Sequence, residues 1–179
     1  MDRNLVSLLI SLSVVILSLA GCKQAAQKPT EHNIPIKVAI IYNFGGAQPV
    51  AREYFYLLNK DANQLWKEAG LLNAEKLRVP SMTKQPSDES VFRFYFSLDM
   101  LRVSEGNPSQ FEDALKPFIV KTVNTDFEGN ATFENVPEGV YYIYGVTETR
   151  SGYAVWNYKV STEENKTVLL DNKNAVYAW

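Results

Sequence analysis

The sequence of 179 residues contains one cysteine, Cys22, and one histidine, His32. A lone cysteine cannot form an intrachain disulfide, and a Cys/His zinc site needs more ligands than these two residues supply. A Ser–His–Asp triad requires a histidine beside the serine, whereas His32 lies in a polar segment near the N-terminus. The sequence therefore predicts a protein that has no metal or other cofactor and is not an enzyme.

The sequence also lacks an excess of charge of either sign. It has 18 Lys and Arg against 20 Asp and Glu, a net charge of −2. Nucleic-acid-binding domains carry a basic excess, and membrane-surface modules carry clusters of Lys and Arg. Motifs for phosphate loops, dinucleotide binding and zinc peptidases are missing too. These absences exclude nucleic acid as a partner and leave a chain rich in aromatic residues, at 12%.

The first 22 residues have the three-part pattern of a secretion signal. Leu5–Ala20 is uncharged and apolar, but it is shorter than the about 20 residues that a membrane-spanning helix needs. It leads into Leu19-Ala20-Gly21-Cys22, which resembles the lipobox of bacterial lipoproteins. The resemblance implies that residues 1–21 are removed and that Cys22 carries a diacylglycerol and an amide-linked acyl chain such as palmitate.

Lipidation predicts the location of the protein. Two or more acyl chains anchor a protein stably, so we expect a cell-envelope lipoprotein attached to a membrane through Cys22. Lys23 follows Cys22 where an Asp could stand, which favours the outer membrane in a Gram-negative organism. Residues 22–35 are polar, contain two prolines and are interpreted as a tether.

Residues 36–179 are predicted to form one globular domain of the all-β class. Short β-branched or aromatic runs are separated by turn signals every 8–12 residues, which is typical of a β-sandwich. The predicted strands are 36–42, 52–58, 118–125, 130–133, 140–146, 153–160 and 166–170. Asp126-Phe127-Glu128-Gly129 has the residue types of a type I turn and lacks the glycine position and distal glutamate of a calcium loop.

Residues 59–116 depart from this pattern and are interpreted as a helical insertion. Residues 61–70 and 109–115 have capping residues and helical spacing. Residues 88–104 fit both a helix and a strand. Phe92, Phe94, Phe96, Leu98 and Met100 alternate as in a strand, whereas Val91, Phe94 or Tyr95, Leu98 and Leu101 form a helical stripe. The flanking start and stop signals, Ser87 and Gly106, favour the helix.

One motif carries a resemblance to a family. The pattern Thr125-Asp126-x-x-Gly129-x-Ala131-x-Phe133-x-x-Val136-Pro137-x-Gly139-x-Tyr141-x-Ile143 is similar to that of carboxypeptidase regulatory-like, transthyretin-related domains and of collagen-adhesin B-type repeats. The resemblance implies a prealbumin-like Greek-key sandwich of about seven strands. Its structural residues would be Asp126, Gly129, Phe133, Val136, Pro137, Gly139 and Tyr141.

Physical reasons can be given for these motif residues. Gly129 and Gly139 are expected in turns that need a positive φ. Phe133 and Val136 are expected in the core, and Tyr141 is expected to hydrogen-bond a neighbouring backbone group as in a tyrosine corner.

The adhesin resemblance raises the possibility of a covalent cross-link. Some of these repeats join a first-strand Lys to a last-strand Asn through an isopeptide bond promoted by a buried Glu. Lys37, Glu148 and either Asn172 or Asn174 occupy roughly the corresponding places. The segment around Glu148 lacks the family's proline, and we favour the interpretation that these are solvated surface residues.

Four aromatic residues form a possible binding surface: Tyr142, Tyr144, Trp156 and Tyr158. Strand alternation places Tyr142 and Tyr144 on the sheet face opposite Tyr141. If the four aromatic side chains were exposed, they would form a platform for a glycan or a protein, because Tyr and Trp are enriched at binding surfaces. The favoured alternative is that the insertion packs over this face and buries them.

These observations predict a non-catalytic binding, adhesion or structural module of the cell envelope. Its partners would be the membrane, through the lipid, and an envelope protein or glycan. The alternatives are a glycan-binding lipoprotein and an assembly component of an envelope or secretion complex. An aromatic groove would favour a glycan, whereas an exposed apolar tip of the insertion would favour a protein partner.

Overall fold

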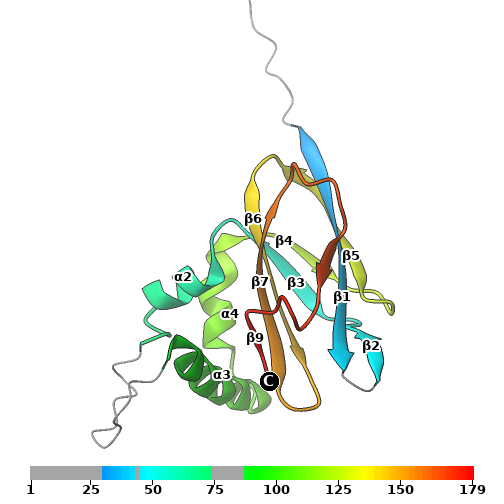
Figure 1. The fold of residues 1–179 in the computed structure, drawn as a ribbon. Coiled ribbons are helices and arrows are strands. Elements are labelled where there is room, and N and C mark those ends of the chain that lie inside the picture. Colours follow the sequence, from blue (N-terminus) through cyan, green and yellow to red (C-terminus); the bar gives the residue numbers. More distant parts are fainter. Residues whose placement is uncertain (1–29, 43–44, 74–86) are drawn as a thin grey trace, which may run out of the picture.

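The computed structural model describes residues 30–42, 45–73 and 87–179 (Figure 1). These residues form two β-sheets packed face to face, with helices on the outer face of one sheet, which confirms the predicted β-sandwich with a helical insertion. The strands are β1 (Glu31–Tyr42), β2 (Gly46–Pro49), β3 (Tyr54–Leu58), β4 (Ile119–Asn124), β5 (Asn130–Pro137), β6 (Val140–Glu148), β7 (Tyr153–Ser161), β8 (Val168–Leu170) and β9 (Tyr177–Ala178).

The first sheet is built around β1. This strand pairs antiparallel with β2 and β5 and parallel with β8. The second sheet is antiparallel throughout, in the order β4-β3-β6-β7-β9. Successive parts of the chain alternate between the sheets, since β5 joins the first sheet between two strands of the second. Each sheet therefore needs the other to cover its apolar face.

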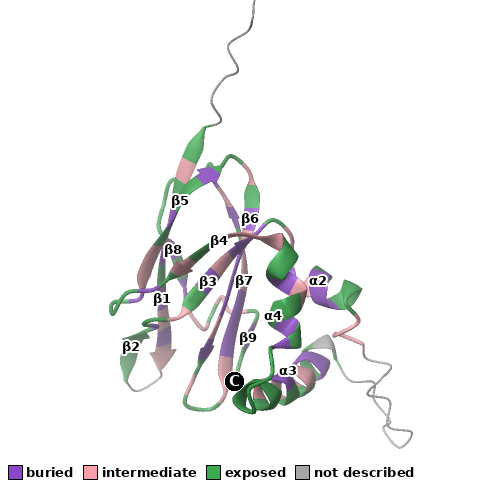
Figure 2. Ribbon diagram, turned by 180° about the vertical axis from the view of Figure 1, so that it is seen from behind, coloured by how far each residue is buried: buried purple, intermediate pink, exposed green. Residues whose placement is uncertain are grey.

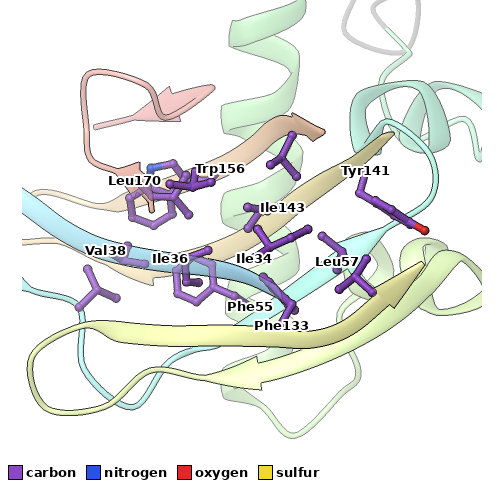
Figure 3. Close-up of a cluster of buried hydrophobic side chains, with 14 of the residues drawn as sticks. Ile34, Ile36, Val38, Phe55, Leu57, Phe133, Tyr141, Ile143, Trp156 and Leu170 are labelled. Atoms are coloured by element: carbon purple, nitrogen blue, oxygen red, sulfur yellow. The ribbon is translucent and has the colours of Figure 1, made fainter. Parts of the chain in front are cut away.

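The space between the sheets is filled by branched and aromatic side chains that alternate along their strands (Figure 3). Phe55 and Trp156 meet near its centre with ring centroids 5.8 Å apart. The indole Nε1 of Trp156 donates to the backbone oxygen of Asp171 over 2.8 Å, so this buried donor is satisfied. The fully buried members include Val38, Phe55, Leu57, Phe133, Val136, Ile143 and Trp156.

The described residues of the insertion and its end form three α-helices and a short 3₁₀ helix: α2 (Ala62–Glu68), α3 (Asp88–Ser104), α4 (Gln110–Leu115) and η2 (Lys116–Phe118). A polar side chain caps each α-helix N-terminus. The Asp61 side chain accepts a hydrogen bond from the backbone N–H of Gln64. In the same way, Ser87 accepts from the backbone N–H of Ser90, and Ser109 accepts from that of Glu112. Each such cap contributes about 1 kcal/mol to helix stability. Residues 88–104, whose pattern fitted both a helix and a strand, form the helix α3.

The helices cover the outer face of the second sheet (Figure 2). They form a second apolar cluster there, in which Trp66 of α2 meets Phe92 of α3 and Phe111 of α4 at centroid distances of 5.3 Å. The Trp66 indole also donates to the Phe111 backbone oxygen. The other fully or nearly buried members are Leu58, Ala62, Leu65, Phe96, Leu115, Tyr144, Val155 and Tyr177.

Some boundaries differ from those predicted. β1 begins at Glu31, so the last five residues of the predicted tether are strand, and His32 pairs with Val136. The strands β2 and β9 were not predicted, because four and two residues are too short for a periodic pattern. Among the described helices, none is both long and apolar enough to span a bilayer.

Candidate functional site

The four predicted platform residues do not form one surface. Tyr142 and Tyr144 lie on the outer face of the second sheet, where the insertion covers them, as the favoured alternative predicted. Trp156 and Tyr158 pack on the opposite face, against the core between the sheets. The pairing of β6 with β7 sets Gly145 opposite Trp156, and directly paired residues share a face. A one-residue difference in register reverses every side chain, and the sequence pattern does not fix register.

The predicted isopeptide residues are not brought together. Lys37 is exposed on the outer face of the first sheet, because its neighbours Ile36 and Val38 fill the core. Glu148 is exposed at the end of β6. The Asn172 side chain accepts from the Ile41 amide, and that of Asn174 bonds the backbone of Leu169 and Asp171. This arrangement contradicts a buried Lys–Glu–Asn site.

The motif residues around Asp126 form the predicted turn. The Asp126 carboxylate accepts from the backbone amides of Glu128 and Asn130, each over 2.8 Å, and the Asn130 amide leads the causes that lower its pKa. Gly129 has a φ of 78°, and a Cβ there would lie 2.3 Å from the Val38 backbone oxygen. Both facts require glycine, and the close approach to Val38 ties the turn to β1.

The other motif residues are also structural. Phe133 and Val136 are fully buried, and the Tyr141 hydroxyl donates to the Pro137 backbone oxygen over 3.0 Å, as a tyrosine corner does. Gly139 does not have the expected positive φ. Glycine fits there because a Cβ would lie only 3.2 Å from the Tyr141 ring.

The surface of α3 carries an apolar row that the core does not use. Phe94, Leu98 and Leu101 are 49%, 44% and 62% exposed. Their i, i+4, i+7 spacing places them on one helix face, which we call the α3 outer face. The stripe that predicted the helix is therefore mostly its solvent side, while Phe92 and Phe96 form the buried side.

A groove of about 470 Å³ lies beside the α3 outer face. Its lining includes Leu98, Leu101, Arg102 and Tyr95 from α3, and Leu71 after α2. Asp99 also lines it, but its carboxylate accepts from the Ser109 hydroxyl and from the amides of Gln110 and Phe111. This buried carboxylate anchors the start of α4, so the groove offers mainly apolar contacts with a charged rim.

A smaller hollow of about 70 Å³ lies between α4 and the second sheet. We call it the tyrosine notch; it is lined by Tyr56, Glu112, Leu115, Lys116, Ile119 and Tyr144. The Tyr56 and Tyr144 rings stack with centroids 6.1 Å apart. The Tyr144 hydroxyl is buried and has no hydrogen-bond partner among the described residues.

Burial is the largest cause of the pKa shifts in the tyrosine notch. It raises the pKa of Glu112, and the nearby Asp99 carboxylate raises that pKa further. Burial also raises the pKa of Tyr144 well above its usual value, with the Glu112 carboxylate adding to the effect. Sequence analysis did not find this hollow, because its members come from three strands, an α-helix and a 3₁₀ helix without a shared motif.

Cys22, the predicted lipidation site, lies outside the described residues. Across the described ranges, no group of three or more His, Cys, Asp or Glu side chains is arranged to hold a metal ion.

Comparisons with known proteins give no family. No family model and no curated protein sequence matches the chain. Among solved structures, a candidate carbohydrate-binding protein from Pseudomonas aeruginosa aligns with a TM-score of 0.39 and 18% identity over 82% of this chain and 92% of that one. The SpaB basal pilin of Lactobacillus rhamnosus GG aligns with a TM-score of 0.32 and 16% identity over 82% and 98%.

A third structure, the pilus backbone protein RrgB of Streptococcus pneumoniae, aligns with a TM-score of 0.29 and 14% identity over 72% of this chain and 34% of that one. At these scores, the alignments do not carry an argument about function.

Proposed function

We propose that the protein is a lipid-anchored, non-catalytic binding module of the cell envelope, and that the α3 outer face receives a protein partner. The observation that carries this proposal is the exposed row of Phe94, Leu98 and Leu101. Contiguous apolar patches on a soluble surface mark interaction sites. Anchors at i, i+4 and i+7 are the spacing with which one helix packs against another apolar segment.

The position of this face relative to the chain's N-terminal side supports a protein over a bilayer as the occupant. The chain enters β1 at one end of the sandwich, and α3 lies at the other end (Figure 1). The 12 residues of β1 span about 40 Å at the usual rise per residue. With an anchor on Cys22, α3 would lie at the end of the sandwich opposite the membrane attachment.

The groove beside α3 adds a place for a side chain of the partner. Its apolar wall is formed by Leu71, Leu98 and Leu101, and Arg102 and Glu105 lie in its lining. An apolar partner residue would fill the groove while polar groups of the partner meet the two charges. Such an apolar centre with a polar rim is the usual anatomy of a protein–protein interface.

The glycan alternative rested on the four aromatic residues, and these are divided between two covered faces. An assembly role in an envelope or secretion complex is compatible with a protein-binding face. In such a complex, the α3 outer face would be the surface that contacts the neighbouring component.

Photo-crosslinking in intact cells tests this surface. A photoreactive amino acid is placed at Leu101 on the α3 outer face or at Leu169 on the outer face of the first sheet. The two positions are a matched pair, because each leucine is 62% exposed. We expect a discrete protein adduct from Leu101 that is not formed from Leu169 and that disappears when Phe94 and Leu98 are changed to Ser.

Three results would overturn the proposal. They are equal labelling from the two positions, adducts with lipid only, and an adduct of twice the chain's mass, which would identify a second copy as the occupant.

The anchor has its own test. Cys22→Ser should move the protein from the membrane fraction to the soluble fraction, because it removes the attachment point for the acyl chains. Retention of this variant in the membrane fraction would contradict lipidation without bearing on the α3 outer face.

A further inference from the structure

We propose that the tyrosine notch binds one protonated primary amine, the head of a lysine side chain or of a free alkylamine. This site is separate from the α3 outer face and does not depend on the function proposed for that face. The notch combines a buried hydroxyl group without a partner, an unpaired carboxylate and two stacked aromatic rings.

The first support is the Tyr144 hydroxyl. The Tyr144 residue is 1% exposed, and its ring stacks on Tyr56 and makes a T-shaped contact with Trp66, at centroid distances of 6.1 and 5.7 Å. A buried polar group without a partner costs about 1–3 kcal/mol. Tyr144 lines the notch, and we infer that a donor that enters the notch reaches the hydroxyl oxygen by a small movement of the lining side chains.

The second support is the balance of charge. Lys116 pairs with Asp113, whereas the Glu112 carboxylate forms no ion pair with a described residue. The ionisable groups around the notch, apart from the tyrosines, are Asp99, Glu112, Asp113 and Lys116. Three acids and one base favour a cationic ligand over an anionic one.

The third support is size and donor chemistry. A hollow of about 70 Å³ admits an ammonium group and its first methylenes but is too small for a sugar ring. Calcium requires six to eight oxygen ligands, and one carboxylate with a neutral phenol does not supply them. An ammonium group has three donors. It can bond the Glu112 carboxylate and the Tyr144 oxygen while it lies against the Tyr56 ring, a favourable cation–π contact.

NMR titration of the full-length protein tests the site. The probes are Nα-acetyl-lysine amide, butylammonium and the uncharged Nα-acetyl-norleucine amide, and the readout is the ring signals of Tyr56 and Tyr144. We expect saturable shifts with the two charged probes and none with the norleucine amide. Tighter binding of the lysine amide would indicate a peptide source, and tighter binding of butylammonium a free amine.

Variants make the test specific. Tyr144→Phe and Glu112→Gln should each weaken binding of the charged probes about tenfold or more, because each removes a hydrogen bond to a charged group. Tyr142→Phe, on the same strand and face but outside the notch, should leave the affinity unchanged. Melting temperatures confirm that each variant is folded.

The following results would overturn the proposal: no saturable shift up to high millimolar probe, which would leave the notch to ordered water only; equal shifts from the norleucine amide; or an unchanged affinity in folded Tyr144→Phe. Binding should also weaken on acidification. Protonation of Glu112 removes its charge, and Asp99, Asp113 and Lys116 are the other charged groups that face it.

Discussion

At the scale of single residues, the packing between the two sheets depends on one missing side chain. Gly145 in β6 lies opposite Trp156 and beside Phe55. A Cβ at Gly145 would fall 2.2 Å from an edge carbon of the Phe55 ring. The ring cannot move aside freely, because it lies at the centre of a close-packed core.

Gly145→Ala should therefore lower the free energy of unfolding by about 1–3 kcal/mol, the usual cost of overpacking a core. Urea unfolding followed by tryptophan fluorescence measures this change. Gly45→Ala is the matched control, since among the described residues a Cβ there has only Tyr42 Cβ nearby, at 3.8 Å, and it should change stability little. Equal effects of the two substitutions would contradict the described packing around Phe55.

The raised pKa of Glu112 predicts that the stability of the protein depends on pH. Burial first, and then the Asp99 carboxylate, raise the pKa of Glu112 in the folded state. An acid whose folded pKa is raised is destabilised when ionised, so its contribution to stability falls as the pH rises through its unfolded and then its folded pKa. The Glu112 side chain keeps part of its surface in solvent, which screens this effect, so Glu112→Gln should raise stability at pH 7 slightly and flatten the pH profile in this window.

Asp126 supplies the contrasting control. The Asn130 backbone amide leads the interactions that lower the Asp126 pKa. Its stabilising effect is therefore present above the unfolded pKa and lost as the pH falls through the folded one. Asp126→Asn should lower stability at pH 7, and denaturation curves at several pH values distinguish the two signs. A decrease with Glu112→Gln would contradict the environment described for that carboxyl group.

At the scale of elements, α3 explains why the sequence pattern was ambiguous. Its buried side contains Phe92 and Phe96, and its outer face contains Phe94, Leu98 and Leu101. Apolar residues on opposite sides of a helix cancel the amphipathic signal, and their overlap imitates the alternation of a strand. The caps decided the assignment correctly, because they depend on local backbone chemistry rather than on burial.

Alanine substitutions on the two sides of α3 should separate core from surface. Phe92 is fully buried and stacks on Tyr177 at a centroid distance of 3.9 Å, so Phe92→Ala should cost about 3–5 kcal/mol. Phe94→Ala removes a half-exposed ring from the outer face and should change stability by less than about 0.5 kcal/mol. Chemical denaturation of both variants provides the comparison, and a reversed order would place the core on the wrong side of α3.

Much of the fold follows from local sequence signals, whereas the candidate site does not. The turn at Asp126–Gly129 and the Tyr141 corner were predictable, because their hydrogen bonds join residues close in sequence. The sheet face on which Trp156 and Tyr158 lie depends on the register between β6 and β7. That register is set by contacts between residues far apart in the chain. The exposure of the α3 outer face depends on which side of the helix meets the sheet.

At the scale of the whole molecule, the two proposed contact regions lie at opposite ends of the sandwich. The chain enters β1 at one end, and the insertion places α3 at the other (Figures 1 and 2). We propose that the lipid on Cys22 holds the first end at the membrane and that the α3 outer face meets a partner protein. Because Cys22 is the only cysteine and would be blocked by lipid, a cysteine introduced elsewhere would be the only reactive thiol.

The labelling rate of such a thiol tests the central claim most directly. Leu101→Cys and Leu169→Cys are labelled with a small maleimide, both in intact cells and as purified protein. The account predicts that Leu101→Cys reacts severalfold more slowly in cells than when purified, while Leu169→Cys reacts at similar rates in both. Equal rates for Leu101→Cys in cells and in purified form would show an unoccupied face and contradict the proposal.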